Sequence, residues 1–114
     1  MGPGTHVNAI GADAKGKQEL EPQILKDAVL VVDEREQSIH GGEVNVPFSA
    51  GLLSQEDIDA TLGEIVCGLK PGRRNAQEMT VFDSTGLAIQ DVGLGFRIYQ
   101  KALKQGIGSF ANLF

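Results

Sequence analysis

The chain has 114 residues, a length that allows a single domain with a modest core. Its net charge of -5 argues against a general nucleic-acid binder, which would carry a basic face. No apolar run approaches the length of a membrane span, and the first residues lack the pattern of a signal peptide. The single cysteine, Cys67, excludes an internal disulfide framework, and its apolar neighbours predict that it is buried. We therefore expect a cytoplasmic protein that binds neither a membrane nor a nucleic acid.

The apolar runs of the chain predict short strands that alternate with helices. Val7–Ile10 and the β-branched run Ala28–Val32 are typical of buried strands, and the second pattern belongs to a strand covered on both faces, as in a parallel sheet. Between them, Pro22 fits the first turn of a short helix, where its missing N–H costs nothing. A third strand is predicted at Met79–Phe82. The pattern as a whole predicts an α/β protein with a parallel sheet.

The region between the second and third predicted strands shows one loop and two helical patterns. We expect a helical turn at Arg35–Ile39 and a surface loop at Glu43–Leu53, which contains a proline and a glycine. Ser54 is typical of a helix N-cap, and an apolar stripe at helical spacing follows it. The stripe consists of Ile58, Leu62, Ile65 and Val66.

After the third strand, the pattern predicts a long helix that begins near Thr85. Its apolar side chains cover more than one face, so we expect other elements to enclose it. They are Leu87, Ile89, Val92, Leu94, Phe96, Ile98 and Leu103. The tail that follows is also apolar, and we expect it to dock on a core or a partner. Its apolar residues are Ile107, Phe110, Leu113 and Phe114.

Two polar turns follow the ends of predicted strands. The first strand breaks at Gly11, where backbone and ligand can approach closely and a positive φ is open, and Asp13, Lys15 and Lys17 follow. The third strand ends in the stretch DSTG at residues 83–86. Ligands of open α/β sheets bind beyond the carboxyl ends of the strands, so both turns are suited to one site. The alternative is an ordinary polar connection between a strand and a helix.

Several stretches of the sequence resemble one family closely. They are PGTHVNAIGADAKGKQEL, VVDEREQSIHGGEVNVP, LGEIVCGLKPGR and TVFDSTGLAIQDV. These motifs resemble the ornithine cyclodeaminase/mu-crystallin family, which includes an archaeal-type alanine dehydrogenase, and they occur in the family's order. The resemblance extends from Gly2 to about Leu103 and matches only the later part of the family's sequence.

The resemblance implies the second half of a Rossmann-type parallel sheet followed by a long C-terminal helix. Residues 1–84 would be a partial NAD(P)-binding Rossmann domain, and residues 85–114 a helix and tail that return to a dimerisation and substrate domain. The dinucleotide-binding loop G-x-G-x-x-G is missing, because the glycines at 93 and 95 lie inside a helical pattern. The acidic residue for the ribose and the Arg and Lys for the substrate carboxylate are missing too. By resemblance, the chain is a truncated fragment.

The resemblance also assigns residues to a cofactor site. They match positions along the nicotinamide half of NAD, with NADP not excluded, and Ser84 matches a hydrogen-bonding residue at the nicotinamide end. The implied cofactor residues are Ile10, Gly11, Ala12, Asp13, Lys17 and Ser84. Asp13 further matches the catalytic proton donor or acceptor beside the amino-bearing carbon of the substrate. Thr85 matches a substrate contact that is often apolar in cyclodeaminases, which leaves the substrate open.

Two functional hypotheses follow from these residues. The first is an NAD-dependent amino-acid oxidoreductase or deaminase of ornithine cyclodeaminase or alanine dehydrogenase type, which moves a hydride from the α carbon to nicotinamide through an imine and forms a homodimer. The second is a non-catalytic α/β binding or assembly module, similar to mu-crystallin. No metal is expected, because His40 and Glu43 would need further ligands that the sequence does not identify.

Overall fold

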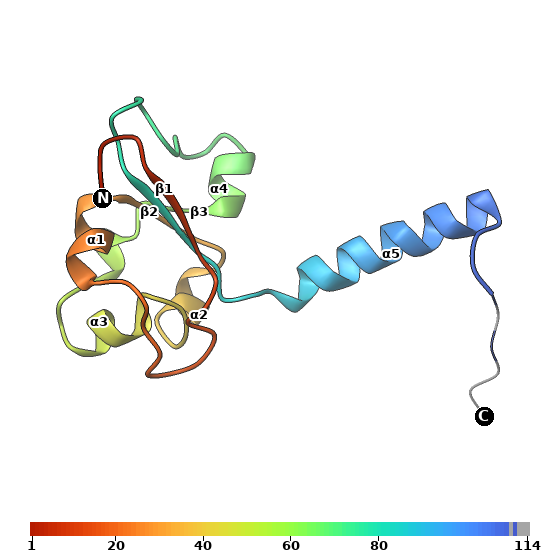
Figure 1. Cartoon of the computed structure of the whole chain (residues 1–114), viewed down its shortest axis with the longest axis horizontal. Helices are drawn as coiled ribbons and strands as arrows, with labels where there is room; N and C mark the ends of the chain where they lie inside the picture. The colour runs from red at the N-terminus through yellow and green to blue at the C-terminus, as the bar shows by residue number, and fades with distance from the viewer. Residues whose placement is uncertain (110, 112–114) are drawn as a thin grey trace.

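The computed structural model of the protein describes residues 1–109 and 111. Figure 1 shows a small sheet with short helices around it, and one long helix that extends away from this body. Three residues of the predicted apolar tail, Phe110, Leu113 and Phe114, lie outside the described residues.

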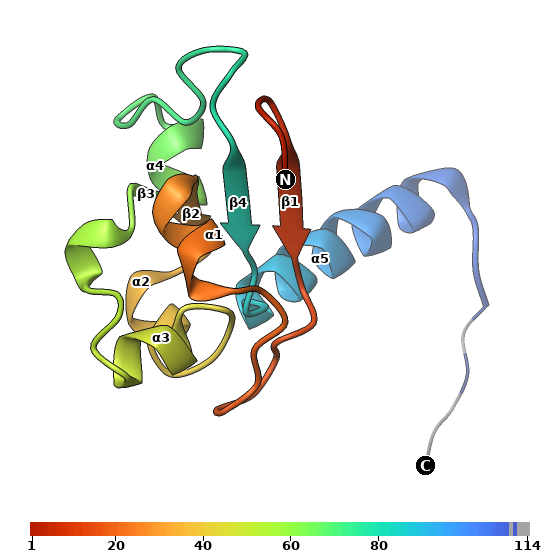
Figure 2. The ribbon, with the colours of Figure 1, turned by 60° about the vertical axis from the view of Figure 1, so that its left-hand side comes forward.

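The sheet has four parallel strands in the order β1-β4-β2-β3. The strands are β1 (His6–Ala9), β2 (Val29–Val32), β3 (Ala60–Thr61) and β4 (Thr80–Asp83). Figure 2 shows β1 and β4 side by side and pointing the same way. Together with the long C-terminal helix, this arrangement confirms the predicted fold class.

The core lies between one face of the sheet and two short helices, α1 (Pro22–Asp27) and α3 (Asn45–Ser49). All four residues of β2 are buried, as expected for a parallel strand covered on both faces. The buried core residues are Ala9, Leu25, Leu30, Val32, Val44, Leu53, Ile58 and Val81. The helix predicted to begin at Pro22 is confirmed, and so is the helical turn after β2, which is α2 (Arg35–Ser38).

The prediction of a surface loop at residues 43–53 is wrong. This segment contains α3, and Pro47 lies in its first turn, where a missing N–H breaks no helical hydrogen bond. The first part of the segment is largely buried, whereas residues 49–52 are exposed. Its buried residues include Glu43, Val44, Asn45, Pro47 and Leu53.

The helical stripe predicted after Ser54 is also wrong. Ser54 caps only a short 3-10 turn, η1 (Gln55–Asp57), through reciprocal hydrogen bonds with Asp57. Asp59 then exchanges two hydrogen bonds with the backbone of Leu30, so β3 forms beside β2. A new helix, α4 (Leu62–Val66), begins after Thr61, which accepts a hydrogen bond from Glu64 N and caps it. Ile58 is therefore core, whereas Leu62 and Val66 are exposed.

Three smaller expectations differ from the structure. Strand β1 ends one residue early, and Ile10 is exposed. Strand β4 continues through Asp83, which pairs with Ala9 of β1 and Val32 of β2. Cys67 is exposed and not buried, because it follows α4 on the outer surface of the molecule.

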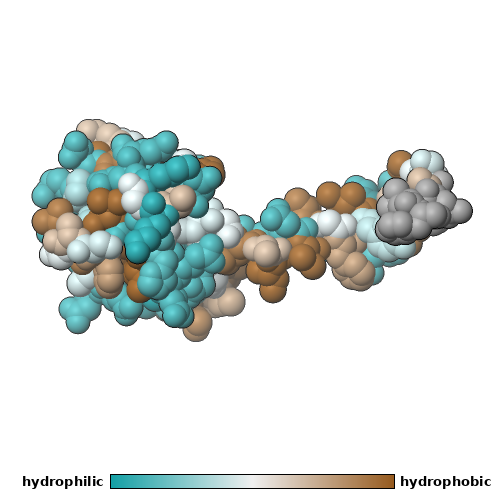
Figure 3. Space-filling model, turned by 90° about the horizontal axis from the view of Figure 1, so that it is seen from below, coloured by the Kyte–Doolittle hydropathy of each residue, from teal (hydrophilic) through white to brown (hydrophobic). Residues whose placement is uncertain are grey.

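The long helix α5 (Ala88–Gln105) is confirmed, but the expectation that other elements enclose it is not met within the described residues. Its large apolar side chains are exposed, and Figure 3 shows hydrophobic side chains gathered along the extended helix. Gly106 ends the helix in the left-handed conformation with φ of 63°, which glycine adopts at low cost. No helix in the described part of the chain is long and apolar enough to cross a membrane.

Candidate functional site

The two polar turns lie side by side beyond the carboxyl ends of β1 and β4, which form one edge of the sheet. Ala9 at the end of β1 is opposite Asp83 at the end of β4, and Ser84 N donates a hydrogen bond of 2.9 Å to Ala9 O. Because both strands run in the same direction, the turn that carries Asp13 and the turn that carries Ser84 leave the sheet at the same edge. The expectation of a shared edge is therefore confirmed.

In the first turn, Asp13 and Lys17 form an ion pair. The distance from Lys17 Nζ to Asp13 Oδ1 is 2.5 Å, and both side chains are more than half exposed. The Asp13 backbone N–H donates to Gly11 O, which tightens the turn. Gly11 does not adopt a positive φ, but a Cβ at this position would lie 2.2 Å from a carboxylate oxygen of Glu19. The missing side chain of Gly11 thus makes room for the Glu19 carboxylate, and the backbone does not adopt the positive φ that glycine allows.

The ion pair sets the charge of Asp13. The hydrogen bond and the positive charge of Lys17 hold the pKa of the Asp13 carboxyl below its usual range. The same contact raises the pKa of Lys17. Asp13 is therefore an exposed carboxylate at neutral pH, able to stabilise a neighbouring positive charge or to accept a proton.

In the second turn, Asp33 holds the backbone and the hydroxyl groups. Its carboxylate accepts hydrogen bonds from Thr85 N (2.7 Å), Gly86 N (2.8 Å) and the Thr85 hydroxyl (2.8 Å), with the Ser84 hydroxyl at 3.4 Å. The single proton of the Thr85 hydroxyl is used by Asp33, so this oxygen can offer only an acceptor to a ligand.

Four buried polar residues support the two turns, and the sequence placed only Asp83 among them, as part of the DSTG turn. They are Asp33, Glu43, Asn45 and Asp83. The sequence carries a partial signal for the burial of Glu43 and Asn45. Polar and apolar residues alternate in the stretch EVNV at residues 43–46, inside a segment with few charges. Their burial could not be inferred because their hydrogen-bond partners lie far away in the sequence. Asn45 and its partner Lys17 are 28 residues apart, and Glu43 and its partner Asp83 are 40 residues apart.

Asp83 is buried at the end of β4, and its pKa is shifted. Its carboxylate accepts hydrogen bonds from Glu43 N (2.9 Å) and Val44 N (3.2 Å). Burial raises the pKa of Asp83 to about 6, although the two backbone hydrogen bonds oppose the shift. Asp83 therefore joins the end of β4 to the turn before α3.

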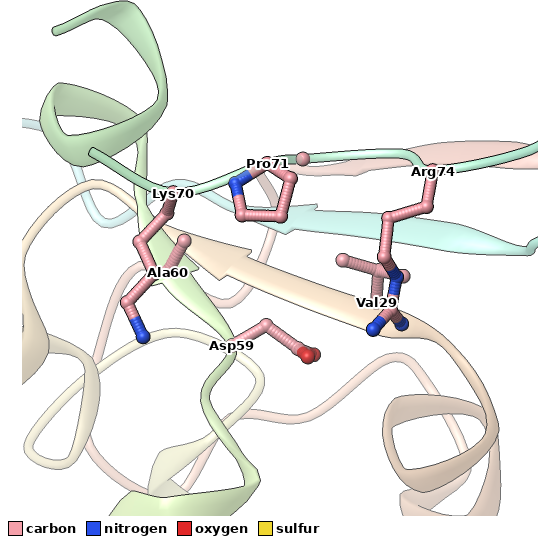
Figure 4. Close-up of a pocket in the computed structure, with 7 residues that line it drawn as sticks. Val29, Asp59, Ala60, Lys70, Pro71 and Arg74 are labelled. Atoms are coloured by element: carbon pink, nitrogen blue, oxygen red, sulfur yellow. The ribbon is translucent and has the colours of Figure 1, made fainter. Parts of the chain in front are cut away.

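A small pocket lies at the other end of the sheet. It has a volume of about 150 Å³ and includes Val29, the first residue of β2, in its lining. Figure 4 shows the side chains of Lys70 and Arg74 extending from one loop toward Asp59 and Val29. Because this pocket lies at the amino end of β2, it is separate from the edge where Asp13 and Ser84 meet.

An open parallel sheet with polar turns beyond its carboxyl ends is the architecture of nucleotide-binding α/β proteins. The family model of the ornithine cyclodeaminase/mu-crystallin family matches residues 1–106, so the chain belongs to this family.

Known relatives agree with this assignment. The chain is 55% identical over 111 residues to an alanine dehydrogenase of Archaeoglobus fulgidus, covering 97% of this chain and 34% of the relative. A solved structure of an archaeal alanine dehydrogenase dimer with bound NAD matches with a TM-score of 0.90 and 54% identity, covering 100% of this chain and 36% of that one. The Thermococcus litoralis Δ1-pyrroline-2-carboxylate reductase, in complex with NADH and L-proline, matches with a TM-score of 0.90 and 36% identity over 97% and 35% of the two chains. The chain thus spans about a third of the length of these relatives.

Proposed function

We propose that this chain forms the nicotinamide side of the active site in an NAD-dependent amino-acid oxidoreductase or deaminase. The observation that carries the proposal is the shared edge, where the ion-paired carboxylate of Asp13 and the hydroxyl-bearing turn at Ser84 follow adjacent parallel strands. Relatives that are solved with NAD or NADH match this chain over nearly all of its length.

The residues at the edge fit a nicotinamide ring. Ile10 is 67% exposed and offers an apolar surface beside Gly11, whose missing side chain makes room for the Glu19 carboxylate. The hydroxyl of Ser84 suits a polar ring substituent, and the cation of Lys17 suits a phosphate or a ribose hydroxyl. Ala12 is buried and holds the turn in place. A bound nicotinamide would supply the acceptor for the hydride that leaves the α carbon of the substrate.

Asp13 would act on the substrate. Oxidation of an amino acid at its α carbon leaves a cationic imine, and a carboxylate beside that carbon stabilises the positive charge. The same carboxylate can move protons to and from the nitrogen or an attacking water. Thr85 would contact the substrate as a hydrogen-bond acceptor, because its proton is used by Asp33. This arrangement serves deamination by water as well as ring closure by a distal amine.

The proposal is tested by Asp13→Asn in a complete enzyme. The 114 residues replace the matching third of the Archaeoglobus fulgidus alanine dehydrogenase, and NAD reduction by alanine is followed. We expect kcat to fall by about 10²- to 10⁴-fold, the typical contribution of a positioned acid or base, while the Kd for NAD stays within error. The matched control is Lys15→Gln, because Lys15 lies in the same turn and has no proposed role. Equal activity of Asp13→Asn and the unsubstituted chimera would contradict the proposal.

The division of the chain is part of the same proposal. Residues 1–84 would complete a Rossmann-type NAD(P)-binding domain, and residues 85–114 would return to a substrate and dimerisation domain. The exposed apolar side chains of α5 support this role, since a helix of this kind requires a partner surface. A homodimer is the assembly that we propose, as in the archaeal alanine dehydrogenase dimer.

A second candidate concerns the 114 residues by themselves. They contain no Gly-rich loop that opens a helix after a strand, and this loop is what holds the pyrophosphate in Rossmann domains. On this observation, the isolated chain would be a non-catalytic α/β binding or assembly module. We expect titration calorimetry of the isolated chain with NAD to give no measurable heat of binding at micromolar protein. A micromolar Kd would exclude this second candidate.

A further inference from the structure

One buried turn contacts both ends of the loop that carries Asp13. This turn comprises residues 42–45 and is called the clamp turn below. The side chain of Asn45 is 3% exposed, accepts a hydrogen bond from Gly16 N (2.9 Å) and donates one to Lys17 O (3.0 Å). A second hydrogen of the same amide group binds Gly42 O, so the orientation of Asn45 is fixed within the clamp turn. Asn45 thereby holds the backbone of Lys17, whose side chain pairs with Asp13.

The second contact of the clamp turn closes the far end of the loop. Glu43 is fully buried, and its carboxylate accepts hydrogen bonds from Glu19 N (3.0 Å) and Leu20 N (2.9 Å). A buried carboxylate is costly unless it is hydrogen-bonded, so these donors tie the loop to Glu43. The loop is thus fixed at residues 16, 17, 19 and 20 by two buried side chains of one turn.

The third contact fixes the near end of the loop and joins it to β4. Gly42 N donates a hydrogen bond of 2.7 Å to Ala12 O, the residue before Asp13. Gly42 has a φ of 77°, and a Cβ there would lie 2.5 Å from a carboxylate oxygen of Asp83. Asp83 in turn binds the backbone of Glu43 and directly precedes Ser84. The clamp turn therefore binds the backbone just before Asp13 in the first polar turn and the side chain just before Ser84 in the second.

We propose that Asn45 and Glu43 are positioning residues that hold Asp13 and Lys17 in their paired geometry at the edge of the sheet. The positioning of the ion pair follows from these contacts alone. Its importance for catalysis rests on the proposed function. Asp13 and Lys17 are exposed, and within the described residues the side-chain hydrogen bond recorded for Asp13 is the one with Lys17. The pair has little packing of its own, so its placement depends on the backbone that the clamp turn holds.

The first test uses the 114-residue chain and Asn45→Ala. The titration of the Asp13 side-chain carboxyl carbon is followed by NMR at low ionic strength. In the unsubstituted chain we expect an Asp13 pKa below the usual value, because of Lys17. In Asn45→Ala we expect it to rise toward the ordinary value of 3.8, because the backbone at Gly16 and Lys17 is released. Glu43→Gln, which keeps the shape and one acceptor oxygen, should give a smaller rise and serves if Asn45→Ala does not fold.

The matched control is Thr61→Ala. Thr61 caps α4 and makes no hydrogen bond with the loop at residues 13–20, and its loss should lower the midpoint of urea unfolding. Thr61→Ala should therefore destabilise the fold and leave the Asp13 pKa unchanged. The control thus separates general destabilisation from release of the Asp13 loop. If a folded Asn45→Ala or Glu43→Gln titrates at Asp13 as the unsubstituted chain does, the positioning role is excluded.

The second test uses the alanine dehydrogenase chimera and separates positioning from the proposed function. Asn45→Ala should lower kcat, shift the acidic limb of the pH profile upward and raise the KM for NAD, because Lys17 is a proposed cofactor contact. If Asp13→Asn leaves turnover intact while the NMR titration still responds to Asn45→Ala, the proposed function fails and the positioning role stands. If Asp13→Asn abolishes turnover but the NMR titration does not respond, the positioning role alone fails.

Discussion

Asp83 is the residue at which the two turns and the sheet meet. Its carboxylate is 1% exposed, and the nearby acids Glu43 and Asp33 add their charges to the effect of burial. Two backbone N–H groups stabilise its charged form and oppose the shift, yet the pKa of Asp83 still rises to about 6. A buried acid of this kind makes stability depend on pH near neutrality.

The expected direction follows from the sign of the shift. The folded pKa of about 6 lies above the ordinary value of 3.8, so the folded state binds this proton more tightly than the unfolded chain does. The stabilising contribution of Asp83 is complete below pH 4 and is lost as the pH rises through 6. Relative to Asp83→Asn, we expect the unfolding free energy of the unsubstituted chain to fall by about 2 kcal/mol between pH 4 and pH 7.

Urea unfolding followed by circular dichroism at a series of pH values measures this difference. Asp83→Asn is the suitable comparison because it resembles the protonated acid in size and keeps one acceptor oxygen. Glu43 and Asp33 lie near Asp83 in both proteins, so the subtraction isolates the effect of residue 83 to first order. Parallel pH dependences of the two proteins would show that Asp83 does not titrate in this range.

At the scale of single elements, α5 differs from the rest of the fold. Its exposed side chains form a stripe with successive spacings of three and four residues, the pattern of a helix that packs along another helix. The stripe consists of Ile89, Val92, Phe96, Tyr99 and Leu103. An amphipathic helix gains most of its stability from burial of such a stripe, so the isolated chain carries an apolar surface that favours association.

We expect the isolated chain to self-associate through α5. Sedimentation velocity should show a weight-average mass that increases with protein concentration, and the combined substitution of Val92→Glu and Phe96→Glu should remove this increase. The control is Gln90→Glu with Gln100→Glu, which adds the same charge to the same helix outside the stripe. A monomer at all concentrations, or equal loss of association in both variants, would contradict a role for the stripe.

At the scale of the whole molecule, the two faces of the sheet differ. The face with α1 and α3 is a packed core, whereas the opposite face carries an open hollow of about 590 Å³. His6, Asn8 and Phe82 line this hollow together with side chains from α4 and the loop after it. Parallel sheets are usually covered on both faces. The described residues thus pack fully against only one face of the sheet. The chain spans about a third of the length of its relatives.

Local sequence patterns predicted the elements whose causes are local. The run Ala28–Val32 is a strand because its β-branched side chains fit a pleated and buried backbone. Pro22 begins a helix because its fixed φ suits the first helical turn. The prediction failed between residues 43 and 66. There the carboxylates of Asp59 and Asp83 accept hydrogen bonds from the distant backbone of Leu30 and of the clamp turn, and these outweigh local helical spacing.

By itself, the sequence determined the parallel α/β class, the two polar turns at strand ends and the resemblance that the family model confirms, because these depend on neighbouring residues and on motif order. Only the tertiary structure decided that β4 lies between β1 and β2, which brings the Ser84 turn beside the Asp13 turn. It also decided that Glu43 and Asn45 are buried beneath that loop. Hydrogen-bond partners more than twenty residues apart meet only when the sheet has formed, so no local pattern could reveal them.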